Sequence, residues 1–282
     1  DIIHCHDWMT YCAGIAAKDA IGKPLVVHVH ATEYDRTGGN PNPHVYDIER
    51  QGMEKADMIF AVSNFTKYKI VEHYGIHPDK IQVVYNAVEH HKTLFNAQDV
   101  SFGTSDKVVL FLGRITLQKG PDYFIKAACK VLSIDPEVKF IVVGGGDMEA
   151  AMIREAAELG ISRSLLFAGF LSGQDVDRAF QMADLYVMPS VSEPFGITPL
   201  EALINGTPVI ISKQSGVSEV LHHALKVDFW DVDELANKMV AVLRYQESLG
   251  QTLVEHGQQE VYGMTWEKVG ATVKSLYERL VA

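Results

Sequence analysis

The stretch Lys139-Phe-Ile-Val-Val143-Gly144-Gly145-Gly146-Asp147 decides the fold class of this sequence. Its apolar run is typical of a parallel strand that is buried on both faces, and the glycines after it predict a tight turn. Helical patterns flank it at residues 122–133 and 148–160. This order of helix, strand, turn and helix predicts an α/β fold, in which helices cover parallel sheets.

The same alternation continues in both directions along the chain. Further strands are predicted at residues 1–6, 25–30, 58–63, 81–85, 108–112, 165–168, 185–189 and 208–212, and further helices at 173–182, 199–205 and 232–245. Residues 86–106 are polar and lack periodicity, which indicates a connection between two domains. We therefore predict a first domain over residues 1–100, a second over 101–262 and a C-terminal helix over 263–282.

The composition of the 282-residue chain excludes several classes of protein. Hydrophobic residues make up 47% and charged residues 22%, which is typical of a globular protein. The net charge of −11 argues against a nucleic-acid partner, because nucleic-acid binding needs a basic surface. The three cysteines, Cys5, Cys12 and Cys129, form no CxxC pair, so we expect a reducing, cytoplasmic location. No apolar run approaches the ~18–20 residues of a membrane-spanning helix.

Two loops after predicted strands carry features that suit a phosphorylated ligand. Arg114 and Lys119 lie in the loop Gly113-Arg-Ile-Thr-Leu-Gln-Lys-Gly, at a strand's carboxyl end, where they could neutralise a diphosphate. Two solvated loop cations are the alternative. In the second loop, Gly144 and its neighbours let a ligand approach the backbone. The dinucleotide fingerprint GxGxxG is not met there, so a plain tight turn is the alternative.

The third loop, Pro189-Ser-Val-Ser-Glu-Pro-Phe-Gly-Ile-Thr-Pro-Leu-Glu-Ala, is the most informative. Pro199 suits the first turn of a helix, and the Thr198 hydroxyl with nearby amide groups would favour an anion there. Carboxylates such as Glu193 and Glu201 can accept hydrogen bonds from the neighbouring hydroxyls of a sugar or a ribose. The alternative for Glu201 is a favourable charge at the start of a helix.

Together these loops resemble the C-terminal domain of retaining GT-B glycosyltransferases, the glycogen synthase-like superfamily that includes glycosyltransferase family four. The spacing of Glu193 and Glu201 matches the signature of this superfamily. The loop with Arg114 and Lys119 and the loop that begins at Pro189 match as well. Two further stretches also match, Phe167-Ala-Gly-Phe and Ala183-Asp-Leu-Tyr-Val-Met-Pro-Ser. The resemblance covers nearly the whole chain and implies two Rossmann-like domains. It implies transfer of a hexose from a nucleotide diphosphate sugar to a saccharide or other hydroxyl acceptor, with retention of configuration and with neither metal nor other cofactor.

The resemblance also implies roles for individual residues in the second domain. Arg114 and Lys119 would hold the donor diphosphate, and Glu193 would contact the transferred sugar. Thr198 would contact a phosphate oxygen and Glu201 the ribose hydroxyls. The remaining donor-binding positions are Gly113, Gly144, Phe170, Leu171, Phe195, Gly196 and Ile197, of which Phe170 and Leu171 would lie near the base.

In the first domain the resemblance singles out histidines. His30 ends a predicted strand where the family has a histidine that contacts the donor sugar, so we count it as catalytic with Arg114, Lys119 and Glu193. His6 and Asp7 belong to an H-D-W element that lies near the sugar and the acceptor in glycogen and starch synthases. We therefore expect both to bind substrate.

A metallohydrolase is a rival interpretation of the same histidines. His4 and His6, like His28 and His30, form an HxH pair on one face of a strand, and imidazole suits zinc. The later histidines, His222, His223 and His256, fall on apparent helices of the second domain rather than at strand ends. We therefore expect no metal site, and interpret His28 as a residue that either packs in the core or supports a neighbouring site residue.

The two ends of the chain prompt further expectations. Apolar residues at helical spacing from Trp266 to Leu280 predict a helix that packs back on the first domain. Contact with a membrane surface is less favoured, because this face lacks a basic stripe. Family members begin with further strands and a glycine-rich loop, so we expect a missing N-terminal segment and an incomplete first domain. The alternative function is accordingly a non-catalytic fragment that binds nucleotide sugar.

Overall fold

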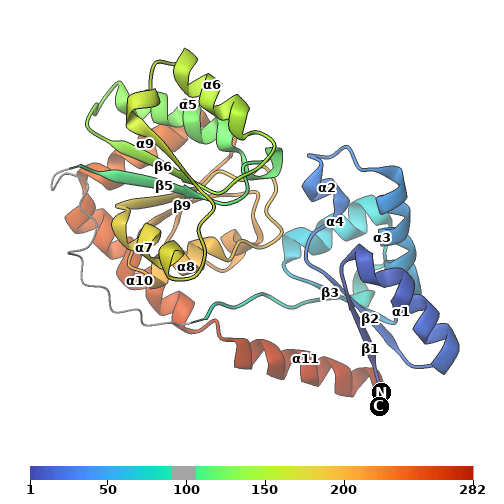
Figure 1. Cartoon of the computed structure of the whole chain (residues 1–282). Coiled ribbons are helices and arrows are strands. Elements are labelled where there is room, and N and C mark those ends of the chain that lie inside the picture. The colour runs from blue at the N-terminus through green and yellow to red at the C-terminus, as the bar shows by residue number, and fades with distance from the viewer. Residues whose placement is uncertain (90–105, 282) are drawn as a thin grey trace.

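The computed structural model describes residues 1–89 and 106–281, which form two α/β domains side by side (Figure 1). The strands of the first domain are β1 (Ile3–His6), β2 (Leu25–Val29), β3 (Met58–Ala61) and β4 (Ile81–Val83). Those of the second are β5 (Val108–Leu112), β6 (Lys139–Val143), β7 (Leu165–Gly169), β8 (Leu185–Met188), β9 (Val209–Ser212) and β10 (Leu225–Val227).

Helices follow most of these strands. Those of the first domain are α1 (Trp8–Ile21), α2 (Glu33–Arg36), α3 (Pro43–Lys55), α4 (Asn64–Tyr74) and the 3₁₀ turn η1 (Pro78–Lys80). The second domain contains α5 (Pro121–Leu132), α6 (Glu149–Glu158), α7 (Gln174–Met182), α8 (Thr198–Ile204), α9 (Val232–Arg244) and α10 (Gln251–Tyr262). Its shorter turns are η2 (Leu117–Lys119), η3 (Ser162–Ser164), η4 (Gly216–Glu219) and η5 (Gln246–Gly250), and the last helix is α11 (Trp266–Val281).

The first sheet has the order β1-β2-β3-β4, and all its strands are parallel. Residues from α1, α3 and α4, such as Tyr11, Met53 and Ile70, bury one face of this sheet. The opposite face carries Val26 and Phe60, against which Leu276 of α11 packs. Figure 1 shows α11 leaving the second domain and running along the first sheet toward the start of β1. The last helix thus joins the two domains.

The second sheet has the order β10-β9-β8-β5-β6-β7 and is also parallel. The chain runs outward from β5 through β6 to β7, then returns to the other side of β5 with β8. This reversal between neighbouring strands is a topological switch point, where the loops diverge and leave room for a ligand. The loops that follow β5 and β8 therefore start side by side.

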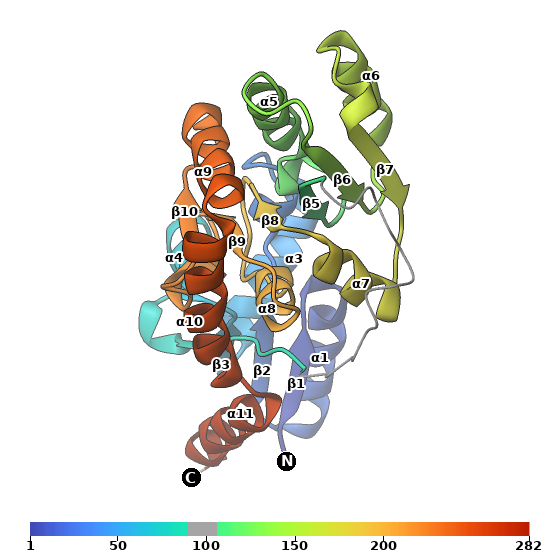
Figure 2. The same ribbon diagram turned by 90° about the vertical axis from the view of Figure 1, so that its left-hand side faces the viewer.

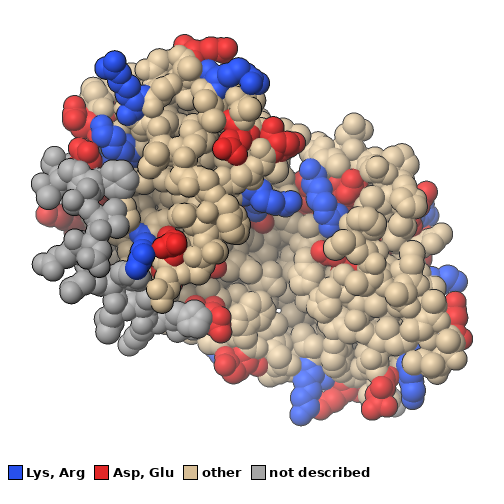
Figure 3. Space-filling model, viewed as in Figure 1, with Lys and Arg blue, Asp and Glu red and all other residues tan. Residues whose placement is uncertain are grey.

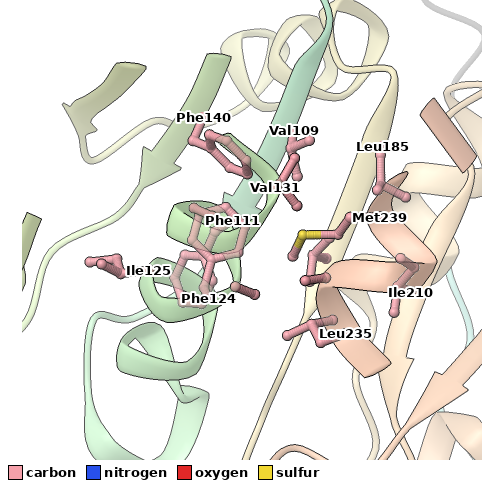
Figure 4. Packing of buried hydrophobic residues seen from close by; sticks show 14 of the residues in the cluster. Val109, Phe111, Phe124, Ile125, Val131, Phe140, Leu185, Ile210, Leu235 and Met239 are labelled. Carbon is pink, nitrogen blue, oxygen red and sulfur yellow. The ribbon is translucent and has the colours of Figure 1, made fainter. Parts of the chain in front are cut away.

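An apolar core fixes that sheet in place. Phe111 and Phe140 lie on the same face of the sheet as Leu185, and Phe124 of α5 and Met239 of α9 pack over them (Figure 4). All five side chains are at most 3% exposed. The opposite face is covered by α7, α8 and α10, and Figure 2 shows helices on both sides of the sheet. A sheet buried on both faces holds its loop-bearing ends rigidly.

The α/β class predicted from the sequence is confirmed, with some corrections at the level of elements. All nine predicted strands are present, but β10 was missed. His222 and His223 lie in a bend before β10, so the expectation that they fall on a helix was wrong. The predicted connection at 86–106 and the boundary near residue 100 fall mostly outside the described residues. None of the described helices combines the length and the apolar character that crossing a bilayer requires.

Candidate functional site

The loops that leave β5 and β8 are joined by an ion pair between Lys119 and Glu193. The side chains are 21% and 9% exposed, respectively, and Ser190 Oγ lies 3.4 Å from the same carboxylate oxygen, Oε2 of Glu193. Gln118 reinforces the junction, because its amide donates to the Ser192 carbonyl at 3.0 Å. Two residues predicted from separate parts of the sequence thus meet at the switch point.

Arg114 is exposed near the same junction, and its guanidinium donates to Gln118 Oε1 at 3.0 Å. Gly144 directly follows the neighbouring strand β6, and its φ of 128° and position against the Gly113 carbonyl leave no space for a Cβ atom. The Gly113 amide donates to Val143 O at 3.0 Å, so the loops after β5 and β6 are held together. The backbone of both predicted glycine positions therefore lies beside the two cations.

Thr198 begins α8, and its hydroxyl accepts a hydrogen bond from Tyr186 Oη at 2.7 Å. Tyr186 also lies 3.2 Å from the carbonyl of Leu112 in β5. Gly196 adopts φ 101°, and a Cβ there would press on Glu193 and Met188. This backbone conformation brings the loop close to Glu193 while Phe195 is buried beneath it and Ile197 is half-buried.

Glu201 lies one turn further along α8 and lines a cavity of about 270 Å³ with Gly173, Val176 and Asp177. Burial raises the pKa of the Glu201 carboxyl, and the negative charge of Asp177 adds to the effect. The ionised form is thus disfavoured by the fold itself. A ligand that donates hydrogen bonds to this carboxylate would relieve that cost.

The segment after β7 presents an exposed aromatic ring. Phe170 is 83% exposed, whereas Leu171 is half-buried against the second domain's core. The amide of Gly144 donates to Gly169 O at 2.8 Å, so this segment starts next to the glycine loop. An exposed ring in that position offers a flat apolar surface on which a base could stack.

In the first domain, Asp7 organises the segment around His30. Asp7 has φ 57°, an uncommon value for a residue other than glycine, and its carboxylate accepts hydrogen bonds from the amides of His30 (2.8 Å) and Ala31 (3.4 Å). The Asp7 carboxylate is therefore occupied by the backbone of its own domain. His6 and His30 are brought together, with His6 Nδ1 2.9 Å from His30 Nε2.

The pKa values of His4, His28 and His30 are lowered. Burial lowers the pKa of His30, with Asp7 acting in the opposite sense and His6 in the same sense. Burial, together with the neighbouring histidines, lowers the pKa of His4 to about 4 and that of His28 to about 2. These rings are accordingly neutral near pH 7. His28 is buried, as the sequence predicted, but it lies among the other histidines rather than in an apolar core.

One contact between the domains joins Asp35 to the loop that carries Glu193. Asp35 lies five residues after His30 and is fully buried; Ser192 Oγ donates to it at 2.5 Å and Lys69 Nζ at 2.6 Å. Burial acts to raise the pKa of Asp35, but Lys69 and the hydrogen bonds hold it below its ordinary value. Ser192 directly precedes Glu193. The predicted residues of the two domains are therefore linked through Asp35.

The second contact is made by Glu219 of η4. Its carboxylate accepts hydrogen bonds from the amides of Asn64 (2.9 Å) and Phe65 (2.6 Å) at the start of α4, and from Tyr85 Oη at 2.9 Å. Nearby, Ser63 Oγ donates to Pro194 O at 2.5 Å. Figure 3 shows a hollow between the two halves of the molecule, with Lys or Arg side chains at its upper edge. The local sequence patterns around Asp35 and Glu219 did not predict that these residues contact the other domain.

Comparison with known proteins places the chain among glycosyltransferases. The family described as "Glycosyl transferases group 1" matches residues 94–259, more than half of the chain, and the family "Glycosyltransferase Family 4" matches residues 1–92. The chain is 30% identical to an uncharacterized glycosyltransferase of Methanocaldococcus jannaschii, over 99% of this chain and 75% of that protein. It is also 30% identical to a D-inositol 3-phosphate glycosyltransferase of a Mycobacterium species, over 91% of this chain and 62% of that relative.

Structural comparison supports the same conclusion at the level of the fold. The crystal structure of the Anabaena protein HepE in complex with UDP and glucose has a TM-score of 0.87 to this chain at 20% identity. The match covers 99% of this chain and 78% of that one. The GT-B fold expected from the sequence is thereby confirmed. By family match, sequence identity and fold, the chain belongs to the group 1 glycosyl transferases.

Proposed function

We propose that this chain transfers a hexose from a nucleoside diphosphate sugar to a hydroxyl group of a saccharide or other acceptor, with retention at the anomeric carbon. The observation that carries the proposal is the Lys119–Glu193 ion pair at the switch point of the second sheet. In a nucleoside diphosphate sugar the sugar is bonded to the diphosphate, so the proposed reaction needs a cation for the diphosphate next to a carboxylate for the sugar. Here they are adjacent and neutralise each other.

Donor binding would break the Lys119–Glu193 ion pair and give each side chain a partner on the donor. A diphosphate placed between Arg114 and Lys119 becomes the counter-ion of Lys119, which frees Glu193 to accept hydrogen bonds from sugar hydroxyls. Ser190 and the Gly196 loop hold the Glu193 carboxylate in place while this exchange occurs. Because the exchange replaces one ion pair with another, neither charge is left unpaired in a partly buried site.

Chemistry then needs stabilisation of the leaving group. The bond between the anomeric carbon and the diphosphate oxygen breaks, a bond to the acceptor oxygen forms, and the acceptor hydroxyl gives up its proton. Negative charge develops on the diphosphate, where Arg114, Lys119 and the Thr198 hydroxyl would stabilise it without a metal ion. His30, uncharged near pH 7, would hydrogen-bond the sugar from the first domain. We assign no residue as a nucleophile.

The ribose and base would occupy the neighbouring region. Glu201 would accept hydrogen bonds from ribose hydroxyls in its cavity, and Phe170 would lie against the base. HepE has been solved with UDP and with UDP-glucose, which supports a nucleotide-sugar donor for a chain of the same fold. The cytoplasm remains the predicted location, on the basis of the three free cysteines.

A donor screen followed by a product analysis tests the proposal. The chain is heated with UDP-, ADP- and GDP-sugars, and the donor that raises its Tm is then supplied with candidate acceptors. At a donor concentration about 100 times its Kd, the apparent stability should rise by roughly 2.7 kcal/mol. An α-linked donor should give an α-linked product by NMR. A β-linked product would disprove retention, and donor binding without turnover would favour a non-catalytic binding protein.

A further inference from the structure

Four histidines form a ladder on one face of the first sheet. His4 and His6 project from β1, and His28 from β2 with His30 directly after it; His6 pairs in register with His28. The ring centroids of His4 and His6 are 4.3 Å apart, as are those of His28 and His30. Across the strands, His6 and His28 are 5.2 Å apart. Side chains of one type from two neighbouring strands thus converge on a small volume.

Several nitrogens in this ladder are buried without a hydrogen-bond partner. His28 is only 6% exposed, and neither its Nδ1 nor its Nε2 has a partner. The buried Nε2 of His4 is also unpartnered, while its Nδ1 is hydrogen-bonded to Tyr277 Oη of α11. Buried polar atoms are normally satisfied, so unpartnered nitrogens on neighbouring histidines point to a ligand that the protein atoms do not supply.

The positions of these nitrogens suit a metal ion. One ring nitrogen from each of His4, His6 and His28 lies within 4.8 Å of the other two. Nitrogens that bind one tetrahedral metal at ~2.1 Å lie roughly 3.4 Å apart, so modest side-chain rotations would bring them into range. With the proton on Nδ1 and donated to Tyr277 Oη, His4 keeps the lone pair of its Nε2 for a metal, as is usual for metal-binding histidines.

We propose that His4, His6 and His28 form a binding site for one divalent late first-row metal ion, such as Zn²⁺, Co²⁺ or Ni²⁺. Three imidazole nitrogens favour these ions over Mg²⁺ and Ca²⁺, which prefer oxygen ligands. The exposed His6 gives the ion access from solvent, and a fourth position stays open there. The site lies on the first sheet, where its ligand His6 also contacts His30, and metal binding is measured below without the transfer reaction.

Spectroscopic titration with Co²⁺ tests this site without an activity assay. The chain is treated with EDTA, dialysed, and titrated with CoCl₂ while its visible absorption is recorded. We expect the ligand-field band of four-coordinate Co²⁺ to saturate at one equivalent and to disappear when Zn²⁺ is added. No band, or a band that rises without saturating near one equivalent, would overturn the proposal.

Substitutions identify the ligands. His6→Ala removes an exposed ring, so the variant should fold, and it should weaken Co²⁺ binding by at least roughly tenfold. His4→Ala should do the same, and Zn²⁺ should raise the Tm of the unaltered chain but not of His6→Ala. The matched control is His256→Ala, which removes an exposed histidine of α10 that stacks on His223. Unchanged binding in His6→Ala, or binding lost in His256→Ala instead, would show an adventitious surface site and disprove the proposal.

Discussion

The carboxylate of Glu201, which we propose binds ribose, lies where its charge opposes folding. Burial and the nearby Asp177 raise its pKa, so the folded chain binds this proton more tightly than the unfolded chain. By linkage, the carboxyl therefore lowers stability as the pH rises through its raised pKa. The proposed contact with ribose hydroxyls would offset this cost. The sequence motif identified Glu201 but did not indicate that the carboxyl is buried.

Replacing Glu201 should separate stability from binding. Glu201→Gln removes the buried charge, so the Tm without nucleotide at pH 7–8 should increase. The variant should bind the nucleoside diphosphate roughly ten- to a hundredfold more weakly, because a hydrogen bond to a charged group contributes about 1.5–3 kcal/mol. Glu193→Gln should instead leave diphosphate affinity nearly unchanged and lower turnover with the sugar donor. Isothermal titration with the diphosphate and turnover assays distinguish the two variants. An equal loss of diphosphate affinity in both would mean that the roles of Glu201 and Glu193 are misassigned.

The cations of the diphosphate loop, Arg114 and Lys119, should matter for rate, and loss of Lys119 should also lower stability because Glu193 loses its counter-ion. Lys119→Ala and Arg114→Ala should each reduce transfer by roughly 10²-fold or more, as removal of one charge-stabilising group from an active site typically does. Lys126→Ala is the matched control, because it removes another lysine of the second domain, one that is half-exposed on α5 and paired with Asp122. Steady-state kinetics on the three variants measure this. Activity close to that of the unaltered chain in the first two would disprove the diphosphate assignment.

At the scale of elements, buried strands were predictable and contacts across the domains were not. Strands such as β6 are continuous apolar runs, and their type follows from the residues alone. The edge strand β10 has three residues with Lys226 at its centre, which gives no such signal. The loops of Lys119 and Glu193 could be placed at strand ends, but their meeting depends on β8 returning beside β5, which is a property of topology.

Helix α4 depends on a cap from the other domain. Glu219 accepts the amides of Asn64 and Phe65, where the helix's own backbone leaves donors unpaired. Glu219→Ala should therefore cost about 0.5–2 kcal/mol and speed hydrogen exchange at these two amides, with Glu219→Gln in between. Glu255→Ala, an exposed glutamate of α10, is the control. Unaltered exchange at the start of α4 in Glu219→Ala would show that the two domains do not hold this contact in solution.

At the scale of the whole molecule, a few polar contacts and helix α11 hold the two domains in one relative orientation. Asp35, Lys69 and Ser192 form one contact, and Glu219 with α4 forms another. Because His30 and Glu193 lie on different domains, any change in the relative orientation of the domains moves His30 relative to Glu193. A displacement of ~1 Å can cost ~10²-fold in rate. The contacts between the domains should therefore influence catalysis without touching substrate.

Asp35 and Lys69 form an ion pair within the first domain, and both hydrogen-bond Ser192 of the second. A double-mutant cycle on this pair tests that expectation. Asp35→Asn should destabilise the chain by about 3 kcal/mol, because Lys69, 18% exposed, loses its counter-ion. Lys69→Met should be comparably costly, whereas the double variant should cost less than the sum, since no unpaired charge remains. Unfolding in urea measures the stabilities, and turnover with the sugar donor should fall in each single variant.

The pH dependence provides an independent check on the same pair. The folded-state pKa of Asp35 is lowered, so its contribution is fully present above about pH 4, the ordinary value of the unfolded chain, and is lost as the pH falls through the folded value. The difference in stability between the unaltered chain and Asp35→Asn should therefore be constant from pH 5 to 8 and shrink below pH 4. Additive single costs, or a difference that grows as the pH falls, would show that Asp35 and Lys69 do not act as a pair at the contact with Ser192.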